Sequence, residues 1–169
     1  MDFLTLSKKR YAVRAYLDQA LSEEHMTSLL QAAQNAPTAH NNQPQVIYVA
    51  QSPEGLAIID QATRGRFNAP VVFVVCYDRR LSWKRKDGAE SGPWDASIIA
   101  THLMLEATDL GLGSIWIGMF KPEILCEKLN LSEDIIPVAL IPVGHIDPKS
   151  VPFEYHDQRR PLSETVKFI

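Results

Sequence analysis

VVFVVCY, at residues 71–77, is the stretch of sequence that decides the fold. Its side chains are apolar almost throughout, and most of them are β-branched or aromatic, which is typical of a β-strand. Because apolar and polar residues do not alternate, we expect this strand to be buried on both of its faces. A sheet that contains such a strand needs helices above and below it, so the sequence predicts a layered fold.

The segments on either side of this strand carry the signals of helix ends. Ser22 precedes two glutamates and a run of apolar residues at helical spacing, which predicts a helix that must stop before Pro37. A long apolar helix is expected at about 94–110, with Gly111 as the residue that follows its end. The latter helix carries almost no charge, so we expect it to be central and mostly buried.

Shorter patterns complete a mixed set of elements. They predict helices at 2–9, 52–62 and 121–130, and strands at 46–50, 114–118 and 137–146. The alternation of helices and strands makes the chain α/β or α+β. Its 169 residues fit a single domain that spans 1–169.

The composition excludes several classes of partner. A formal net charge of −3 and a pI near 5.9 give no overall attraction to nucleic acid or to an acidic membrane surface. No apolar run approaches the roughly 20 residues of a membrane span, and the first residues do not have the order of a secretory signal. Cys76 and Cys126 are interpreted as reduced thiols, so the expected location is the cytoplasm.

The common catalytic motifs are not found. Five histidines are scattered without the spacing of a metal site, so no bound metal is expected, and there is no GxSxG or GxxxxGK[ST] motif. GLGSIWIG, at 111–118, follows a helix and precedes a strand, whereas the dinucleotide-binding motif requires the opposite order. A helix end followed by a tight turn is an equally good reading of these glycines.

Two other features have both a structural and a functional reading. NAPTAHNNQP, at 35–44, carries more side-chain amides than a turn needs, and these amides either satisfy their own backbone or bind a ligand. The paired arginines at 10 and 14 and at 159 and 160 are either solvated or converge on a phosphate ester.

Taken together and in order, these segments resemble the nitroreductase-like flavoprotein family. The resemblance covers essentially the whole chain as a short member, and it rests on RYAVRAY (10–16), APTAHNNQP (36–44), GLGSIWIG (111–118), PVALIPVG (137–144) and RRPLSE (159–164). It implies an α+β, three-layer fold in which helices flank a central, mostly antiparallel mixed sheet. It also implies an intertwined homodimer with two FMN sites at the subunit interface.

The resemblance assigns the cofactor contacts residue by residue. Arg10 would contact the FMN phosphate, Arg14 would lie near the pyrimidine edge of the ring, and one of Arg159 and Arg160 would also bind the phosphate. The family usually has a serine where Ala12 stands, so one hydroxyl contact is missing, and either the backbone or Tyr11 would have to replace it.

Two further segments would contact the flavin ring. The residues expected to face the flavin of the other subunit are Pro37, Thr38, Ala39, Asn41 and Gln43. The residues expected to line the ring near its N5 atom, mainly through their backbone, are Trp116, Ile117 and Gly118.

The implied activity is that of an FMN-dependent oxidoreductase. NADH or NADPH would reduce the flavin in a ping-pong cycle, and a nitroaromatic, a quinone or a similar acceptor would oxidise it. The flavin carries the hydride chemistry, so no catalytic side chain is expected. The alternatives are related flavin chemistry, such as dehalogenation or an oxygen-dependent reaction, and a non-enzymatic flavin-binding or redox-sensing module.

Two polar segments are left for the substrate and the partner subunit. Residues 78–93 form a long loop, and Trp83 together with Trp94, just after the loop, brackets a basic cluster. The loop is therefore either a lid that meets the substrate or a solvated surface. The tail at 150–169 ends in apolar residues and either frays or docks on the partner subunit.

Overall fold

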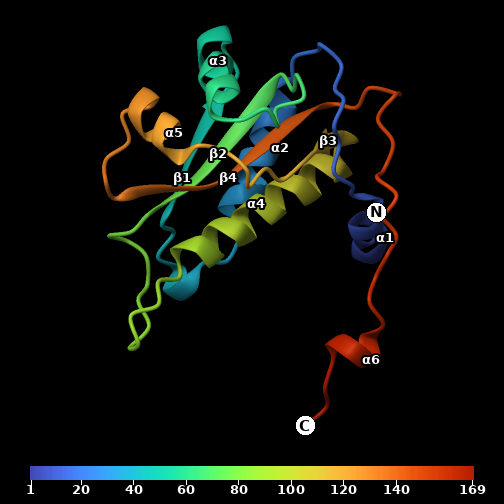
Figure 1. Ribbon diagram of the computed structural model, residues 1–169. Helices are drawn as coiled ribbons and strands as arrows, with labels where there is room; N and C mark the ends of the chain where they lie inside the picture. Colours follow the sequence, from blue (N-terminus) through green and yellow to red (C-terminus); the bar gives the residue numbers. More distant parts are fainter.

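The core of the protein is one four-stranded sheet. The structure, a computed structural model, describes residues 1–169, and its strands pair antiparallel in the order β1-β2-β4-β3 (Figure 1). The strands are β1 (Gln45–Ala50), β2 (Val71–Asp78), β3 (Leu112–Ser114) and β4 (Ile135–His145).

Helices cover both faces of this sheet. One face packs against α2 and α4 and the other against α3 and α5, while α6 lies away from the body in the C-terminal tail (Figure 1). The helices are α1 (Phe3–Lys9), α2 (Glu23–Gln34), the short 3₁₀ helix η1 (Ala39–Asn41), α3 (Pro53–Ala62), α4 (Gly92–Asp109), α5 (Pro122–Lys128) and α6 (Leu162–Thr165). The predicted α+β fold with three layers is confirmed.

Strand β2 explains why the layers form on both sides. All of its residues are buried. Phe73 and Val75 belong to the core between the sheet and the α2–α4 layer, whereas Val72 and Val74 belong to the core on the α3–α5 side. Successive side chains of a strand point to opposite faces, so an uninterrupted apolar run must be covered twice.

The helix ends form as the sequence predicts. The hydroxyl of Ser22 accepts a hydrogen bond from the backbone N–H of His25 at 3.1 Å, which caps α2. Gly111 has a φ of 76°, a left-handed conformation that glycine adopts without strain, directly after the end of α4.

The strand expected at 114–118 is wrong in its position. The regular pairing is β3, which ends at Ser114, and beyond it Ile117 forms only an isolated bridge with Leu140. Beyond Ser114 the backbone still bonds to β4, because the N–H of Ile115 donates to the carbonyl of Pro142 and Ile117 exchanges two hydrogen bonds with Leu140. This pairing is too irregular to extend the strand, and both isoleucines pack against the α3–α5 core. A parallel bridge between Ala12 and Ser114 makes the sheet mixed, though mostly antiparallel.

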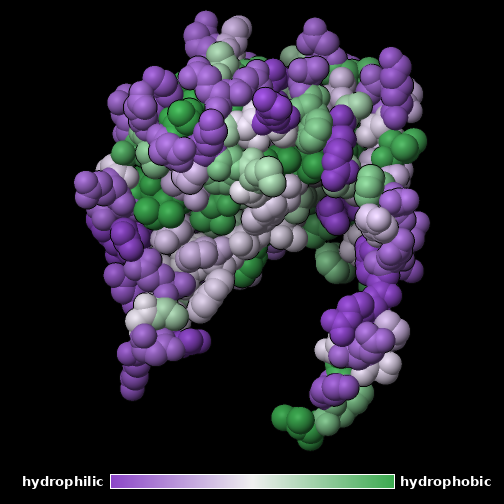
Figure 2. Space-filling model, viewed as in Figure 1, coloured by the Kyte–Doolittle hydropathy of each residue, from purple (hydrophilic) through white to green (hydrophobic).

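The C-terminal tail extends from the body and is exposed along almost its whole length (Figure 1, Figure 2). Leu162 is 77% exposed and Phe168 is 97% exposed. Contacts with the body come from the first part of the tail, where Nε2 of His156 lies 3.1 Å from the carbonyl oxygen of Lys8. None of the helices has the length and apolar character needed to cross a membrane.

Candidate functional site

Two segments about a hundred residues apart lie side by side at the end of the sheet. Ala12 forms its parallel bridge with Ser114, and the backbone N–H of Val13 donates to the carbonyl of Ser114 at 3.1 Å. This pairing places the arginine-containing segment 10–14 beside the segment 114–118. The sequence motifs expected to hold the phosphate and the ring of one cofactor are therefore adjacent.

Gly113 makes this close approach possible. A Cβ atom at this position would lie 2.8 Å from either methyl carbon of Val13, a distance that real side chains do not tolerate. The second glycine of GLGSIWIG thus serves packing of the two segments, and the first ends α4. Neither glycine opens a helix, as those of a dinucleotide-binding motif do.

The two arginines of segment 10–14 have no carboxylate partner. Arg10 is half-buried and forms no ion pair, and the Nη1 atom of Arg14 donates only to the carbonyl of Ala12 at 3.3 Å. The guanidinium carbon of Arg14 also lies 5.7 Å from the ring centre of Phe153 in the tail. Two guanidinium groups without a counter-ion can hold an anionic ligand.

The loop expected to face a flavin lies at the other end of α4 and is held by Asp95. The carboxylate of Asp95, which is 3% exposed, accepts the backbone N–H of Ala39 at 2.9 Å and the hydroxyl of Ser91 at 2.8 Å. Within the loop, the hydroxyl of Thr38 accepts the backbone N–H of Gln43 at 3.0 Å. The loop is therefore fixed to the first turn of α4.

Three residues of this loop have a left-handed backbone. The φ angles of His40, Asn41 and Gln43 are 53°, 54° and 50°. Such a conformation costs side-chain-bearing residues on the order of 1 kcal/mol each, although asparagine tolerates it best. The amide of Gln43 makes a long contact of 3.4 Å with the carbonyl of Asn41, whereas the side chain of Asn41 is exposed and makes no hydrogen bond in the protein.

His40 and Asn42, to which the sequence assigned no role, connect this loop to residues 78–91. The ring of His40 stacks on Trp83 with 5.4 Å between ring centres and an interplanar angle of 18°. The side-chain amide of Asn42 donates to the carbonyl of Leu81 at 2.9 Å. The two loops therefore form one surface, and Trp83 belongs to it.

The basic cluster of the 78–91 loop is largely neutralised by its own carboxylates. Arg79 and Lys84 both pair with Glu90, and Arg80 pairs with Asp78, whose pKa is lowered by that hydrogen bond. Arg85 pairs with Asp87, and its guanidinium carbon lies 5.9 Å from the ring centre of Trp94, which is half exposed. Apart from Lys86, these cations are thus paired within the loop.

A hollow of about 600 Å³ opens beside Ile117, between the end of α3 and the segment 117–121. Its apolar lining includes Phe67, Ile117, Met119 and Phe120. No motif in the sequence marked this hollow, because its walls come from two segments that are distant in the chain.

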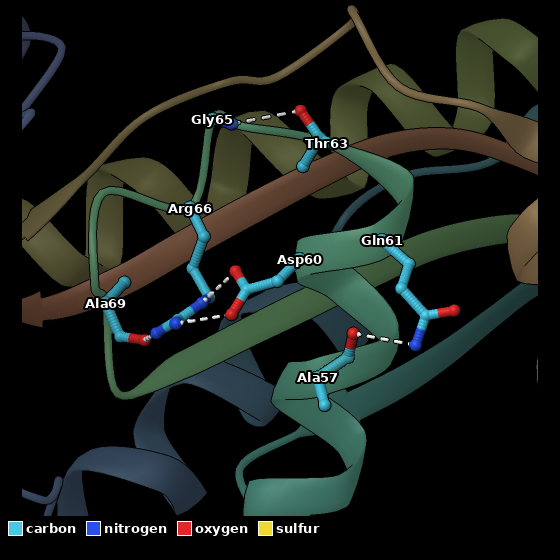
Figure 3. Close-up of polar contacts among 7 residues, drawn as sticks. All are labelled: Ala57, Asp60, Gln61, Thr63, Gly65, Arg66 and Ala69. Carbon is cyan, nitrogen blue, oxygen red and sulfur yellow. Dashed lines mark hydrogen bonds and ion pairs between the residues drawn. The ribbon is translucent and has the colours of Figure 1, made fainter.

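Specific hydrogen bonds hold the walls of this hollow in place (Figure 3). The hydroxyl of Thr63 donates to the carbonyl of Met119 at 2.8 Å. The same hydroxyl accepts the N–H of Gly65 at 3.0 Å. The guanidinium of Arg66 binds both oxygens of Asp60 at 2.6 Å, which raises the pKa of Arg66. Both segments are therefore fixed before any ligand arrives.

The tail arginines are not brought to the site within one chain. Arg159 donates to the carbonyls of His156 and Gln158, and Arg160 pairs with Glu164 at 3.2 Å. All of these residues except His156 are exposed, and this part of the tail leads away from the body toward α6 (Figure 1). A single chain thus assembles only part of the expected site.

Comparison with known proteins identifies relatives over almost the whole chain. The model of the nitroreductase family matches residues 7–67 and 64–145. A nitroreductase family protein of Clostridium difficile 630 superposes with a TM-score of 0.92 at 37% identity, covering 99% of this chain and 98% of that one.

The descriptions of two further relatives mention a cofactor or an electron donor. A Desulfovibrio desulfuricans protein solved in complex with FMN superposes with a TM-score of 0.81 at 27% identity, covering 96% of this chain and 94% of that one. An Archaeoglobus fulgidus protein with the provisional name NADH dehydrogenase/NAD(P)H nitroreductase is 31% identical over 167 residues, which is 95% of this chain and 94% of that protein.

Proposed function

Because this chain belongs to the nitroreductase family, as its sequence motifs predicted, we propose that it is an FMN-dependent NAD(P)H oxidoreductase. NADH or NADPH donates a hydride, and a nitroaromatic, a quinone or a similar compound accepts the electrons in a ping-pong cycle. FMN supplies the hydride chemistry when it is bound, while the protein binds and orients the reactants. The FMN of the Desulfovibrio relative and the NAD(P)H in the name of the Archaeoglobus relative support this assignment.

The pairing of Ala12 with Ser114 is the observation that carries the proposal. In its parallel register Arg10 falls opposite Leu112, just before the 114–118 segment, and Arg14 falls opposite Trp116, so the two paired segments offer a cation at each end and backbone groups between them. Arg10 suits a phosphate, and Arg14 suits the pyrimidine edge, where negative charge develops on reduction. The absence of ion pairs at both arginines leaves them free for these contacts.

The proposed site needs two subunits. Asp95, which holds the 37–43 loop, and Thr108, which lies by Arg10, are separated by about 20 Å along α4, given a rise of about 1.5 Å per residue. A second copy with its α4 oppositely oriented brings the loop of one subunit to the arginines of the other. The apolar side chains that this dimer would cover are exposed in one chain and include Phe3 and Leu4 on α1, Trp94 and Ile98 on α4, and Leu162 and Phe168 in the tail.

The hollow beside Ile117 is the proposed place for the donor and then the acceptor. Its volume of about 600 Å³ is within the usual range for a small-molecule site, and its apolar lining suits a planar ring. In the proposed dimer, Trp83 stays with the 37–43 loop of its own chain, on which it stacks through His40, and both approach the flavin bound by the other subunit. Trp94 contributes to the outer face of α4.

Anaerobic reduction of the bound flavin tests this function. The purified protein is reconstituted with FMN, and its visible absorbance is followed after addition of NADH or NADPH. We expect at least one nicotinamide to bleach the flavin, and a quinone added afterwards to restore the colour. Bound FMN that neither nicotinamide reduces would instead indicate a flavin-binding module, and the oxidoreductase assignment would be abandoned.

A further inference from the structure

A small cavity lies where α1 and α4 end. It measures about 80 Å³, and its lining includes Lys9 and Arg10 from the end of α1, Thr108 from the end of α4, and Ser114 from β3. Lys9 and Arg10 form no ion pair and no side-chain hydrogen bond. Helix C-termini carry partial negative charge, which disfavours an anion. The full positive charges of Lys9 and Arg10 outweigh it, so the cavity prefers an anion.

Ser114 is the buried residue of this cavity whose side chain lacks a partner. Its side chain belongs to a residue that is 1% exposed, and its hydroxyl makes no hydrogen bond. A buried hydroxyl left unpaired is unfavourable, and buried polar groups are almost always satisfied. The neighbouring hydroxyl of Thr108 is satisfied, because it donates to the carbonyl of Met104 at 2.9 Å.

The hydroxyl of Ser114 shares a face with Ala12. The two residues form a parallel bridge, in which paired side chains point to the same side. The opposite side is identified by Val13, whose methyl groups occupy the space where a Cβ of Gly113 would stand. Ser114 therefore presents its hydroxyl next to the position where Ala12 lacks one.

Tyr11 does not supply the missing donor. Its hydroxyl already donates to the carbonyl of Ser150 at 3.1 Å. Of the two replacements considered for the hydroxyl absent at Ala12, the tyrosine is therefore committed to the start of the tail.

We propose that the hydroxyl of Ser114 donates a hydrogen bond to the phosphate of FMN and replaces the hydroxyl that Ala12 does not provide. This inference rests on the proposed function. It gives the unpaired hydroxyl an acceptor, and it gives a counter-ion to Lys9 and Arg10, which line the same cavity. A phosphate group is compact enough for the cavity, and it offers several acceptor oxygens to donors that arrive from different elements.

The test compares two flavins that differ only in the phosphate. Apo-protein is titrated with FMN and with riboflavin, and the dissociation constants are read from flavin fluorescence. Ser114→Ala should weaken FMN binding about tenfold, as expected for loss of one hydrogen bond to a charged group, and leave riboflavin binding unchanged. Ser97→Ala, which removes a hydroxyl from the exposed side of α4, is the matched control.

Rescue and stability give two readouts that are independent of turnover. The double variant Ala12→Ser/Ser114→Ala should recover FMN affinity to within about twofold of the wild type, because the hydroxyl returns on the same face. Ser114→Ala should also melt at a slightly higher temperature as apo-protein, because it removes an unpaired buried hydroxyl.

The remaining outcomes overturn the inference. An unchanged ratio of FMN to riboflavin affinity in Ser114→Ala, or an equal loss for both flavins, would mean that Ser114 does not contact the phosphate. Ser114-dependent binding of inorganic phosphate that does not compete with FMN would identify a separate anion site. Wild-type protein that binds neither flavin would refute the proposed function and this inference together, a result distinct from the others.

Discussion

The loop at 37–43 and the tail at 150–169 are both expected to contact FMN, yet the fold treats them in opposite ways. The loop is held at Ala39 by Asp95, at Asn42 by Leu81, and at His40 by its stacking on Trp83. The end of the tail contacts only itself, as in the pairing of Arg160 with Glu164, and its apolar residues are exposed.

This difference shows which half of the proposed site is prepared before assembly. A loop with three left-handed residues keeps its shape only because its surroundings fix it, and such a loop binds a ligand without a further ordering cost. The tail beyond His156 forms no hydrogen bond or ion pair with the body, so we expect its order and its arginines to depend on a partner. This difference between the loop and the tail can be tested by removing the contacts that hold the loop or by removing the tail.

Removal of the tail after Gln158 should have the largest effect. The deleted residues, Arg159–Ile169, are all exposed, so we expect the melting temperature of the isolated subunit to change little. Dimerisation should be lost. The affinity for FMN should fall at least about 100-fold, because a charge-assisted contact and the shared interface are both removed. Light scattering and fluorescence titration measure the two effects.

Lys167→Ala is the control for this truncation, because it changes a polar side chain in the same segment. It should remain dimeric and bind FMN normally. A truncated protein that stays dimeric with unchanged affinity would show that the tail frays and that the comparison is wrong.

Replacement of Asp95 should have the next largest effect. Asp95→Ala leaves the N–H of Ala39 and the hydroxyl of Ser91 without their buried acceptor, which should cost about 2–4 kcal/mol in the free energy of unfolding. Urea denaturation measures this loss. Asp109→Ala, an exposed carboxylate on the same helix, should change stability by less than about 0.5 kcal/mol. Equal stability of the two variants would contradict the role assigned to Asp95.

The smallest expected effects on stability and FMN affinity distinguish the adjacent residues Asn41 and Asn42. Asn42→Ala removes an exposed hydrogen bond to Leu81 and should lower stability by about 0.5–1 kcal/mol, with little change in FMN affinity. Asn41→Gly keeps the left-handed backbone and removes an unbonded side chain, so stability should hold while FMN affinity falls severalfold. Calorimetry and flavin titration distinguish the two, and a reversed pattern would assign the ligand contact to Asn42.

Local signals were sufficient for most of the fold. The uninterrupted apolar run of β2 required two covering layers, and Ser22 and Gly111 marked the helix ends that the structure contains. The strand expected at 114–118 was placed too late in the chain, because an apolar run records burial. Regular pairing with β4 covers Leu112–Ser114 and leaves only irregular hydrogen bonds at Ile115 and Ile117.

The candidate site was less accessible from local signals. Arg10, Arg14 and the motifs APTAHNNQP and GLGSIWIG were found because each motif is short and the motifs follow one another along the chain in the order of the family. Asp95 and the hollow beside Ile117 gave no signal. Asp95 binds the backbone of Ala39, and the hollow lies where Thr63 bonds to Met119, so both depend on segments that are separated in sequence.

The sequence by itself determined the layered α+β fold, the helix ends and the motifs of the family, because these depend on the periodicity of apolar residues and on local backbone preferences. Only the tertiary structure decided that Ser114 stands beside Ala12 with a free hydroxyl, that Tyr11 is already engaged, and that the 37–43 loop is held by Asp95. Whether a polar group has a partner depends on which distant segments meet, and that is a property of the folded chain.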